Sequence, residues 1–451
     1  MTPRADACLD TDPPDPSPRG TTRIARAGVA FATALATTAS WFATATPAQA
    51  APPPDPTVIF FAIDGFDVDY LDGRVPLPHI TALARRGAIA VGTGVMSSMT
   101  NQSWSSAATG AYPERTKNAS YYWDPATNTV RGQSRDIAVE TLGESLVAAG
   151  HRIASVQWFI LENRGVSYGD PDALYTQPGG DCTKRADDVI AILEGRPVDS
   201  GGTPVTVPEI PDFLAMYCSD VDSAGHATGE HSQETLDALT LVDQQIGRVI
   251  EATKRVGIYH RTTFILSADH GMTTYHRVNG PQVEAAIDAL GYRAEWVDPG
   301  ASPSPDTQVV LAGGGLTSVH LIGDLAGDTR ALARITRAIE QVPGIARAYG
   351  KAEQKAMRMA PVYGDLIVEP DPGWAMFAED APYPRGRHGT TQETRITFLI
   401  AGAGVRPGAT PIAPRLVDIA PTVSYLLGAE PPEASQGRVL IESLLPREVR
   451  V

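Results

Sequence analysis

Five short apolar runs constrain the fold of this 451-residue chain more than any other feature of its sequence. They are 57–63, 152–158, 213–218, 262–267 and 396–401. Apolar runs of this length, without polar alternation, are typical of strands that are buried on both faces, as in a parallel sheet. Helical patterns lie between them, so we expect an α/β fold layered around one sheet.

The helical segments repeat apolar residues at spacings of three and four. The clearest is 232–255, and the others are 77–86, 141–149, 186–193 and 416–427. Residues 275–385 do not continue the alternation of strands and helices, because short strand patterns at 308–311 and 318–322 precede a helical pattern at 328–341. We therefore expect a domain over 51–451 that carries a smaller α+β insertion at about 275–385.

The first fifty residues predict an export signal rather than part of the fold. Arginines precede an apolar, alanine-rich run over 28–45, and the segment ends in Ala48-Gln49-Ala50. A basic region, an apolar region and an Ala-x-Ala end are typical of a secretory signal peptide, with cleavage after Ala50. The alternative is an N-terminal membrane anchor, although the run is short for a bilayer span. We expect a secreted protein without a stable membrane anchor after cleavage.

Two cysteines, Cys182 and Cys218, remain after the predicted cleavage site. In an exported chain they are compatible with one disulfide, and equally with two buried free thiols. The formal net charge of −15 argues against binding of a nucleic-acid polymer, which requires a basic face for its phosphates. An anionic substrate would need local cations to reverse that field.

Aspartate and histidine occur together in four stretches with the character of metal ligands. The candidate ligands are Asp64, Asp222, His226, Asp269, His270 and His388. An isolated Asp-Gly or His-Gly is usually a turn, but together these residues supply three carboxylates and three imidazoles. Such nitrogen and oxygen ligands suit Zn²⁺ or another divalent ion, and the carboxylates would repel one another without metal. The strand ends from which several of them emerge are where open α/β sheets bind ligands.

Hydroxyl groups crowd the segment 96–113, which becomes helical near Thr100. A hydroxyl at a helix N-terminus lies in a positive potential, and a divalent cation on the same oxygen would lower its pKa far enough to make it a nucleophile. Thr100 is therefore a candidate nucleophile. The alternatives are that Thr100 only caps the helix, or that Ser97, Ser98 or Ser103 takes the catalytic role.

These motifs, in this order, resemble the type I phosphodiesterase/nucleotide pyrophosphatase family of the alkaline phosphatase superfamily. The matching segments are Val58–Phe66, Thr100 with the Thr-Gly-Ala-Tyr-Pro-Glu of 109–114, 222–226, 267–272, 387–389 and 418–428. The resemblance covers nearly the whole chain after the signal. It implies an alkaline-phosphatase-like three-layer sandwich with a mostly parallel central sheet, and a catalytic domain over 51–451.

The resemblance also implies a site with two Zn²⁺ ions, with Mn²⁺ or another divalent ion as alternatives. One ion would be held by Asp222, His226 and His388, and the other by Asp64, Asp269 and His270 together with Thr100. Thr100 would attack phosphorus to form a phospho-threonine, which water would then hydrolyse. The expected partner is a small phosphate ester.

The sequence departs from the family pattern around the substrate. The family's phosphate-binding asparagine usually lies 21 residues after the nucleophile, where this chain has Tyr121, so we assign the role to Asn118. Asn101 replaces the family's base-stacking aromatic residue, and Trp158, Phe159 or Tyr168 could stack instead. Arg164 lies in an element that faintly resembles a phosphate-gripping Lys-x-Arg of related monoesterases.

The leading hypothesis is a secreted two-metal phosphodiesterase or nucleotide pyrophosphatase. A phosphomonoesterase or phosphonate hydrolase on the same scaffold is the first alternative, and an inactive exported protein that binds metal or phosphate is the second. An arylsulfatase is disfavoured, because the sequence has no Cys-x-Pro-x-Arg precursor of formylglycine.

Overall fold

The computed structural model describes residues 55–378 and 383–446, which belong to a single unit of the chain. The predicted signal peptide over 1–50, with its cleavage site after Ala50, lies outside the described residues.

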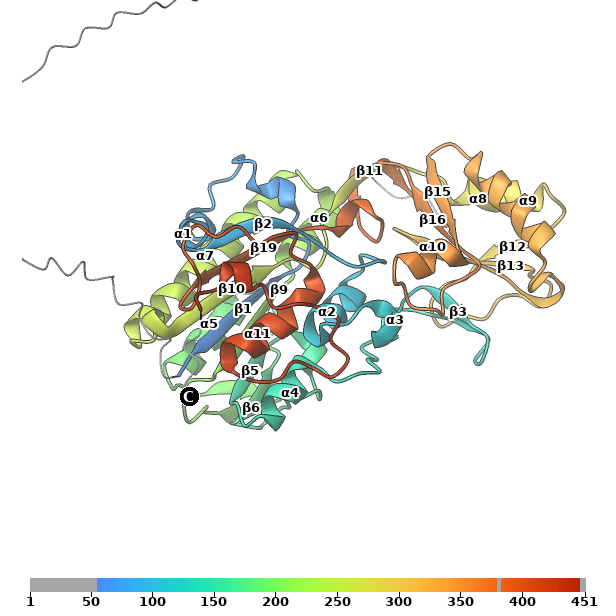
Figure 1. The fold of residues 1–451 in the computed structure, drawn as a ribbon. Helices are drawn as coiled ribbons and strands as arrows, with labels where there is room; N and C mark the ends of the chain where they lie inside the picture. Colours follow the sequence, from blue (N-terminus) through green and yellow to red (C-terminus); the bar gives the residue numbers. More distant parts are fainter. Residues whose placement is uncertain (1–54, 379–382, 447–451) are drawn as a thin grey trace, which may run out of the picture. The chain divides into compact units, whose positions relative to one another are not determined.

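A seven-stranded sheet forms the centre of the fold (Figure 1). In spatial order its strands are β2 (Ala88–Thr93), β19 (Arg395–Gly402), β10 (Thr262–Ser267), β1 (Thr57–Ile63), β9 (Phe213–Cys218), β5 (Ile153–Val156) and β6 (Ala173–Thr176). The five strands from β10 to β6 are parallel, whereas β19 runs antiparallel to both of its neighbours. The run at 396–401 resembles the parallel strands because layers on both faces bury it; burial does not encode strand direction.

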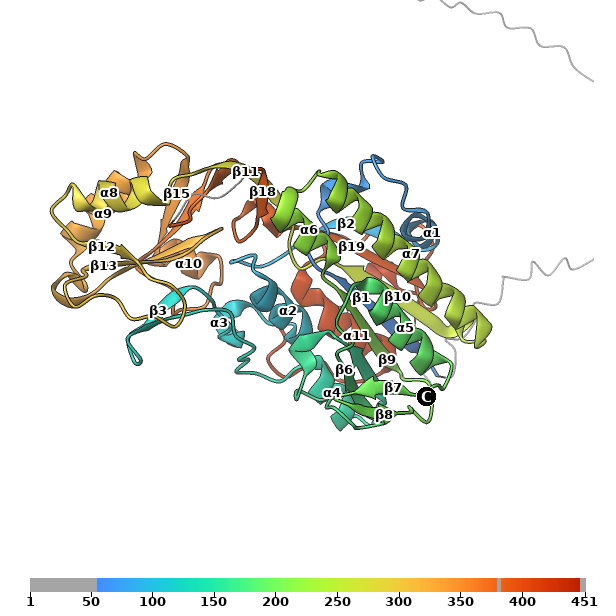
Figure 2. The same ribbon diagram turned by 180° about the vertical axis from the view of Figure 1, so that it is seen from behind.

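Helices cover both faces of this sheet and make the expected three-layer sandwich. One layer contains α2 (Thr100–Thr109), α4 (Leu142–Ala148) and α11 (Ile419–Leu427), seen in front of the sheet in Figure 1. The opposite layer contains α1 (Pro78–Arg86), α5 (Cys182–Leu193), α6 (Asp220–Thr228) and α7 (Gln233–Arg255), and Figure 2 shows α5 and α7 in front. Ser232 caps α7, because its side chain accepts from the backbone N–H of Thr235.

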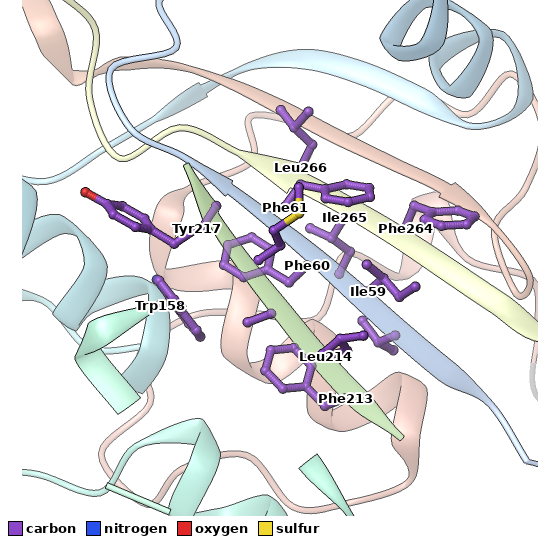
Figure 3. Packing of buried hydrophobic residues seen from close by; sticks show 14 of the residues in the cluster. Ile59, Phe60, Phe61, Trp158, Phe213, Leu214, Tyr217, Phe264, Ile265 and Leu266 are labelled. Carbon is purple, nitrogen blue, oxygen red and sulfur yellow. The ribbon is translucent and has the colours of Figure 1, made fainter. Parts of the chain in front are cut away.

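The core is built on β1, all seven residues of which are buried (Figure 3). Successive side chains of a strand point to opposite faces. The ring of Phe60 therefore packs in one layer against Trp158, with centroids 4.9 Å apart, while Phe61 stacks on Phe264 in the other. Burial of each such side chain contributes about 1.5–3 kcal/mol, so the central strand is anchored on both sides.

A second sheet is built by residues within the segment for which the insertion is predicted. Its strands are β12 (Ala294–Trp296), β13 (Val309–Gly313), β14 (Thr317–Leu321), β16 (Leu366–Pro370) and β15 (Ile345–Gly350), with helices α8 (Gly280–Asp288), α9 (Thr329–Glu340) and α10 (Lys351–Ala356). It has its own apolar core, which includes Val309, Ile335 and Val368. A three-stranded sheet contains, in spatial order, β17 (Gly373–Ala375), β11 (Thr273–Val278) and β18 (Arg385–Arg387). Strand β11 is the next strand after β10 in the chain, and β18 ends next to His388.

The remaining elements are short. They are α3 (Pro113–Thr116), the hairpin β3 (Tyr122–Asp124) with β4 (Thr129–Arg131), and the hairpin β7 (Val198–Ser200) with β8 (Thr203–Val205). Single turns of 3₁₀ helix include η2 (Phe159–Leu161), which follows β5.

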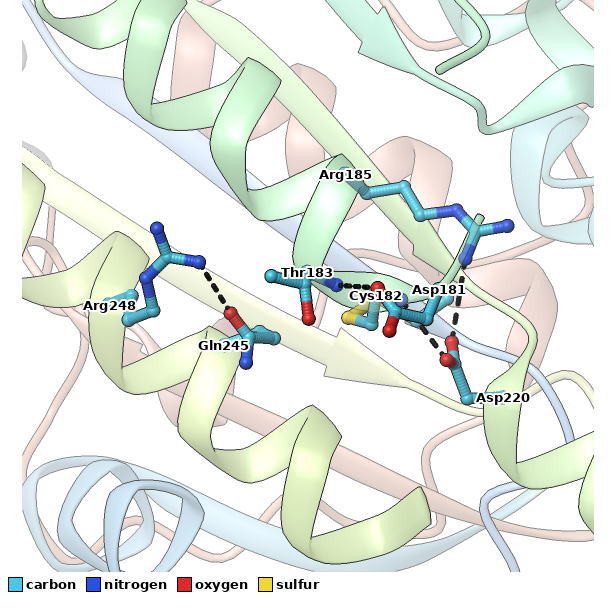
Figure 4. The surroundings of a disulfide bond; sticks show 8 residues. Asp181, Cys182, Thr183, Arg185, Asp220, Gln245 and Arg248 are labelled. Carbon is cyan, nitrogen blue, oxygen red and sulfur yellow. Dashed lines mark hydrogen bonds and ion pairs between the residues drawn. A yellow bond between two sulfur atoms is a disulfide. The ribbon is translucent and has the colours of Figure 1, made fainter. Parts of the chain in front are cut away.

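The structure pairs Cys182 and Cys218 in a disulfide (Figure 4). Cys218 is the last residue of β9, and Cys182 is the first residue of α5. The N–H of Cys182 also donates to Oδ1 of Asp220 at 3.1 Å, and Arg185 approaches Oδ2 of the same carboxylate. The disulfide therefore holds the start of α5 against the carboxyl end of β9.

Candidate metal centre

Two neighbouring strands deliver the first group of polar side chains. Asp64 follows β1 directly, and Asp269 and His270 follow β10 after one alanine. Because β1 and β10 are parallel neighbours, their carboxyl ends lie at the same edge of the sheet. The Nε2 atom of His270 lies 3.3 Å from Oδ1 of Asp64 and 3.2 Å from Oδ2 of Asp269. All three side chains are buried.

A second group forms beside the first, from α6 and the loop after β18. Asp222 and His226 are one turn apart on α6, which begins directly after β9, and His388 follows β18. Oδ1 of Asp222 lies 3.4 Å from Nε2 of His226 and 3.7 Å from Nε2 of His388. The rings of His270 and His388 stack with their centroids 3.6 Å apart, which joins the two groups.

The hydrogen bonds of the three histidines orient their Nε2 lone pairs into these groups. Each Nδ1 lies about a hydrogen-bond length from a backbone carbonyl: 3.0 Å for His226, 2.9 Å for His270 and 2.9 Å for His388. A carbonyl only accepts, so Nδ1 carries the proton and Nε2 of each neutral ring carries a lone pair. The Nε2 atoms of His226 and His388 then face each other at 3.1 Å, an arrangement that a cation between acceptors would stabilise.

The carboxylates give an independent test of whether cations fit here. Oδ1 of Asp64, Oδ1 of Asp222 and Oδ2 of Asp269 are buried and accept no hydrogen bond from any residue that the structure describes. A buried carboxylate oxygen without a partner is costly. Each triad, Asp64 with Asp269 and His270, and Asp222 with His226 and His388, brings one ligand atom per residue within 4.8 Å of the others. The donor set therefore fits two divalent ions.

The pKa shifts in the protein without metal express the same mutual repulsion. Burial raises the pKa of Asp269 well above its usual value, and the neighbouring Asp64 adds to the shift. Burial, again with Asp64, raises the pKa of Asp222 to about 6. Burial lowers the pKa of His270, but the carboxylates of Asp269 and Asp64 outweigh it and raise that pKa to about 10, so in the metal-free protein Nε2 carries a proton that a bound cation would replace. The raised pKa values of Asp222 and Asp269 mean that burial beside Asp64 favours their protonated forms unless cations compensate the charge.

Thr100 lies beside the first group. It is the first residue of α2, and its Oγ1 is 3.2 Å from Nε2 of His270. The N–H groups in the first turn of an α-helix have no acceptor within the helix, so they produce a positive potential around this hydroxyl. The competing serines are engaged differently: Ser97 Oγ pairs with Tyr363, and Ser98 Oγ donates to the carbonyl of Thr390.

Two further residues, Tyr217 and Gly65, support the first ligand group. The hydroxyl of Tyr217, on β9, donates to Oδ2 of Asp64, and Figure 3 shows this ring with its oxygen pointing away from the apolar cluster. Gly65 has a φ of +67° and donates its N–H to Oδ1 of Asp269 at 3.1 Å, and a Cβ here would come within 3.0 Å of Asp222. The lone polar hydroxyl at the end of the apolar run 213–218 was the available signal for Tyr217.

A buried ion pair positions the loop that carries His388. Arg387 is 1% exposed, and its Nη1 lies 3.1 Å from Oε1 of Glu393. The other carboxylate oxygen of Glu393 accepts from both the N–H and the hydroxyl of Thr390. Arg387 belongs to a motif that the sequence reveals, whereas the role of Glu393 could not be predicted, because no local pattern links the two charges.

The structure gives Asn118 a different task from the predicted one. Its Nδ2 donates to the carbonyls of Ser134 and Asp136, both at 2.9 Å, which uses both amide hydrogens. The side chain therefore fixes the segment 134–136 and has no hydrogen left to donate to a phosphoryl oxygen. Asn101, on the first turn of α2, donates to the same carbonyl of Ser134 at 2.7 Å and retains its second amide hydrogen.

Two further residues that were predicted to bind substrate, Trp158 and Arg164, make structural contacts instead. Trp158 is fully buried in the core against Phe60, so it cannot stack on a base. Arg164 binds both carboxylate oxygens of Glu144 and donates to the carbonyls of Ile137 and Val139. It thereby fixes the capped start of α4.

The order of the strands and the helical layers on both faces of the sheet give an alkaline-phosphatase-like fold. Residues 58–391 match the family described as type I phosphodiesterase/nucleotide pyrophosphatase, and the chain belongs to this family. This confirms both the predicted family and the predicted fold class.

Comparisons with individual proteins place the chain among its relatives. It is 33% identical to the venom phosphodiesterase CdcPDE of Crotalus durissus collilineatus over 88 residues, which are 20% of this chain and 9% of the relative. It is 26% identical to mouse ectonucleotide pyrophosphatase/phosphodiesterase family member 7 over 240 residues, 50% of this chain and 52% of the relative. The chain thus spans between a tenth and about half of the length of these relatives.

A solved structure extends the likeness over most of the chain. It is that of murine ectonucleotide pyrophosphatase/phosphodiesterase 5 in an inactive threonine-to-alanine form in complex with AMP. The match has a TM-score of 0.64 at 18% identity and covers 87% of this chain and 97% of that one. Within the described part of this chain, no helix combines the length and apolar character that crossing a membrane requires.

Proposed function

We propose that this protein is an exported two-metal hydrolase of phosphate esters that acts on phosphodiesters or nucleotide pyrophosphates through a phospho-threonine. One observation carries the proposal: three carboxylate oxygens without hydrogen-bond partners among the described residues and three imidazole Nε2 atoms converge beside Thr100. The family of the chain supports a phosphoric ester hydrolase.

Two triads of residues would hold the ions. Asp64, Asp269 and His270, with Thr100 Oγ1 adjacent, form one ligand set, and Asp222, His226 and His388 form the other. Zn²⁺ suits these imidazole and carboxylate ligands, and Mn²⁺ or another divalent ion is the alternative. When bound, the ions would lower the pKa of the hydroxyl and neutralise charge on the attacking and leaving oxygens.

Thr100 would act as the nucleophile. Its Oγ1 forms a bond to phosphorus as the bond to the leaving oxygen breaks, and the threonine proton leaves to solvent while the leaving oxygen gains one. A water then attacks phosphorus, the Thr100–phosphorus bond breaks, and the hydroxyl is restored. The N–H groups of the first turn of α2 would bind the non-bridging phosphoryl oxygens, and Asn101 belongs to that turn.

A diester is favoured over a monoester by the position of Arg164. Arg164 lies in an element that faintly resembles the phosphate-gripping Lys-x-Arg of related monoesterases, but its guanidinium is bound to Glu144 and two backbone carbonyls. The inactive murine relative, a threonine-to-alanine form in complex with AMP, supports both a threonine nucleophile and a nucleotide product. The disulfide supports export, because such bonds form in oxidising compartments.

The function is tested by replacing the nucleophile and comparing two substrates. We expect zinc-loaded protein to hydrolyse bis(p-nitrophenyl) phosphate faster than p-nitrophenyl phosphate. Thr100→Ala should abolish turnover while the metal content stays near two ions per chain. Ser103→Ala is the control, because its hydroxyl is buried and pairs with no described residue. Normal turnover by Thr100→Ala, or a strong preference for the monoester, would contradict the assignment.

A further inference from the structure

Arg135 is linked to the candidate metal centre through two aromatic side chains. Its guanidinium lies over the ring of Phe159, with Cζ 4.9 Å from the ring centroid. The Phe159 ring in turn contacts Tyr217 edge-on, with centroids 5.3 Å apart. Because the hydroxyl of Tyr217 donates to Asp64, only two aromatic rings separate Arg135 from the first ligand group.

The backbone of the same segment is tied to the helix of the nucleophile. The carbonyl of Ser134, the residue before Arg135, accepts from Asn101 at 2.7 Å and from Asn118 at 2.9 Å. Asn101 is the neighbour of Thr100 on the first turn of α2. The backbone beside Arg135 is therefore tied to the first turn of α2, and its side chain packs on Phe159.

The guanidinium keeps the capacity to bind a ligand. Its side chain is 48% exposed although one face covers Phe159, and Nη1 forms an ion pair with Glu162. A guanidinium carries five N–H groups in a fixed plane, and it can stack on a ring while its edge binds an oxyanion. The Glu162 carboxylate, whose side chain is 19% exposed, therefore competes with any anion for this edge.

The negative charge of the protein and of the ligand groups makes an additional cation such as Arg135 important for binding a polyanionic substrate. The chain has a formal net charge of −15, and the two ligand groups contain three carboxylates. Two divalent ions compensate these carboxylates and one phosphoryl group, but they leave little positive charge for further phosphates. A substrate with a second anionic group next to the reacting phosphoryl group needs another cation.

We propose that Arg135, supported by Phe159, binds a second phosphate that is joined to the reacting phosphoryl group, and that it selects phosphoanhydride substrates over diesters with uncharged substituents. This inference rests on the proposed function and specifies its substrate class. Glu162 is the internal competitor of the substrate phosphate, so the two residues of the ion pair have opposite effects on selectivity.

The experiment compares ATP, which has the additional phosphates, with bis(p-nitrophenyl) phosphate, whose second substituent is uncharged. In zinc-loaded enzyme, Arg135→Ala should lower the ratio of kcat/KM for ATP to that for bis(p-nitrophenyl) phosphate by about tenfold or more, the usual effect of losing a charged hydrogen bond. Glu162→Gln should raise the same ratio, because it removes the competing carboxylate. Arg135→Lys should fall between Arg135→Ala and the wild type.

Arg196→Ala is the matched control. Arg196 is also an exposed arginine that pairs with a glutamate, Glu194, but it follows the end of α5, away from the carboxyl edge of the sheet. Its replacement should leave the substrate ratio unchanged. Calorimetric binding of ATP to zinc-loaded Thr100→Ala protein, with and without Arg135→Ala, provides a readout that does not depend on turnover. The second replacement should weaken ATP binding about tenfold.

The outcomes separate this inference from the proposed function. An unchanged substrate ratio in Arg135→Ala, or a fall in Glu162→Gln, would overturn the role of Arg135 while leaving the phosphodiesterase assignment intact. A parallel loss with both substrates would also overturn it, since that result indicates a general structural role. Failure of the proposed function is recognised separately, by turnover that survives in Thr100→Ala.

Discussion

At the scale of single residues, Glu230 is a carboxylate outside the ligand groups whose surroundings are unfavourable to its charge. It lies just after α6, where Oε2 accepts from the N–H of Thr274 and Oε1 is 3.4 Å from Nε2 of His231. Burial raises the pKa of Glu230 to about 7, and the nearby carboxylates Asp67, Asp69 and Glu393 contribute to the shift. The buried Tyr70 hydroxyl is close to the same charges.

Glu230→Gln should therefore stabilise the protein at alkaline pH. The folded-state pKa of about 7 exceeds the ordinary value of 4.5, so protonation of Glu230 favours folding fully below pH 4.5, and this contribution is lost as the pH rises through 7. Glutamine carries no charge and can still accept from Thr274. We expect the variant and the wild type to unfold alike near pH 4.5, and the variant to be about 1–2 kcal/mol more stable at pH 8 after allowance for partial exposure.

Thermal unfolding of metal-free protein across this pH range measures the effect. Glu433→Gln, which replaces an exposed loop carboxylate, is the matched control variant. If the stabilisation by Glu230→Gln were equal at pH 4.5 and pH 8, the elevated pKa would be wrong.

The candidate ligands could be predicted from the sequence because each pair is local. Asp222 and His226 are one helical turn apart, and Asp269 and His270 are adjacent, so both members of each pair lie within one short sequence motif. The remote interactions left no such pattern. Nothing near Arg164 in sequence indicates that Glu144, twenty residues away, binds it, and nothing near Asn118 indicates that carbonyls of 134 and 136 take its amide hydrogens.

At the scale of secondary-structure elements, the disulfide fixes the strand end from which the second ligand group departs. Cys218 ends β9, and Asp222 follows four residues later on α6. The bond joins residues 36 apart in sequence. Closing a loop of that size restricts the unfolded chain and contributes about 3–4 kcal/mol in the chain-entropy account.

The double variant Cys182→Ser/Cys218→Ser should accordingly lose about 3–4 kcal/mol of unfolding free energy in denaturant titrations. The same titrations with reductant provide the control, because the wild type and the variant should then unfold at similar concentrations. Equal midpoints without reductant would show that the bond does not stabilise the fold.

The positions of the strands and helices could largely be predicted from the sequence, whereas the directions of the strands within the sheet could not. The apolar run at 213–218 and the periodic run ending at Arg255 coincide with β9 and α7, since burial dictates both patterns. The chain leaves β10 at the carboxyl edge of the parallel strands and enters β19 at that same edge, so β19 runs antiparallel to β10. That path is a property of the tertiary connection and has no local signature.

At the scale of the whole molecule, the candidate centre is where distant parts of the chain meet. Asp64 comes from the first strand, while His388 lies beyond the insertion and is oriented by the carbonyl of Ser98. Ions bound between these residues would connect the sheet edge, α6 and the loop after β18. Metal binding should therefore stabilise the tertiary structure as a whole as well as supplying the chemistry.

Removal of metal should lower the unfolding temperature, and reloading with Zn²⁺ should restore it. A ligand at one hundred times its dissociation constant stabilises the folded state by about 2.7 kcal/mol per site, and here it also relieves the repulsion that raises the pKa values of Asp222 and Asp269.

His388→Ala removes one ligand of the second group. We therefore expect the metal content measured by elemental analysis to fall from about two ions per chain towards one, and Zn²⁺ to restore only part of the stability. Retention of both ions by His388→Ala, or an unfolding temperature insensitive to chelation, would contradict a two-ion centre built by these residues.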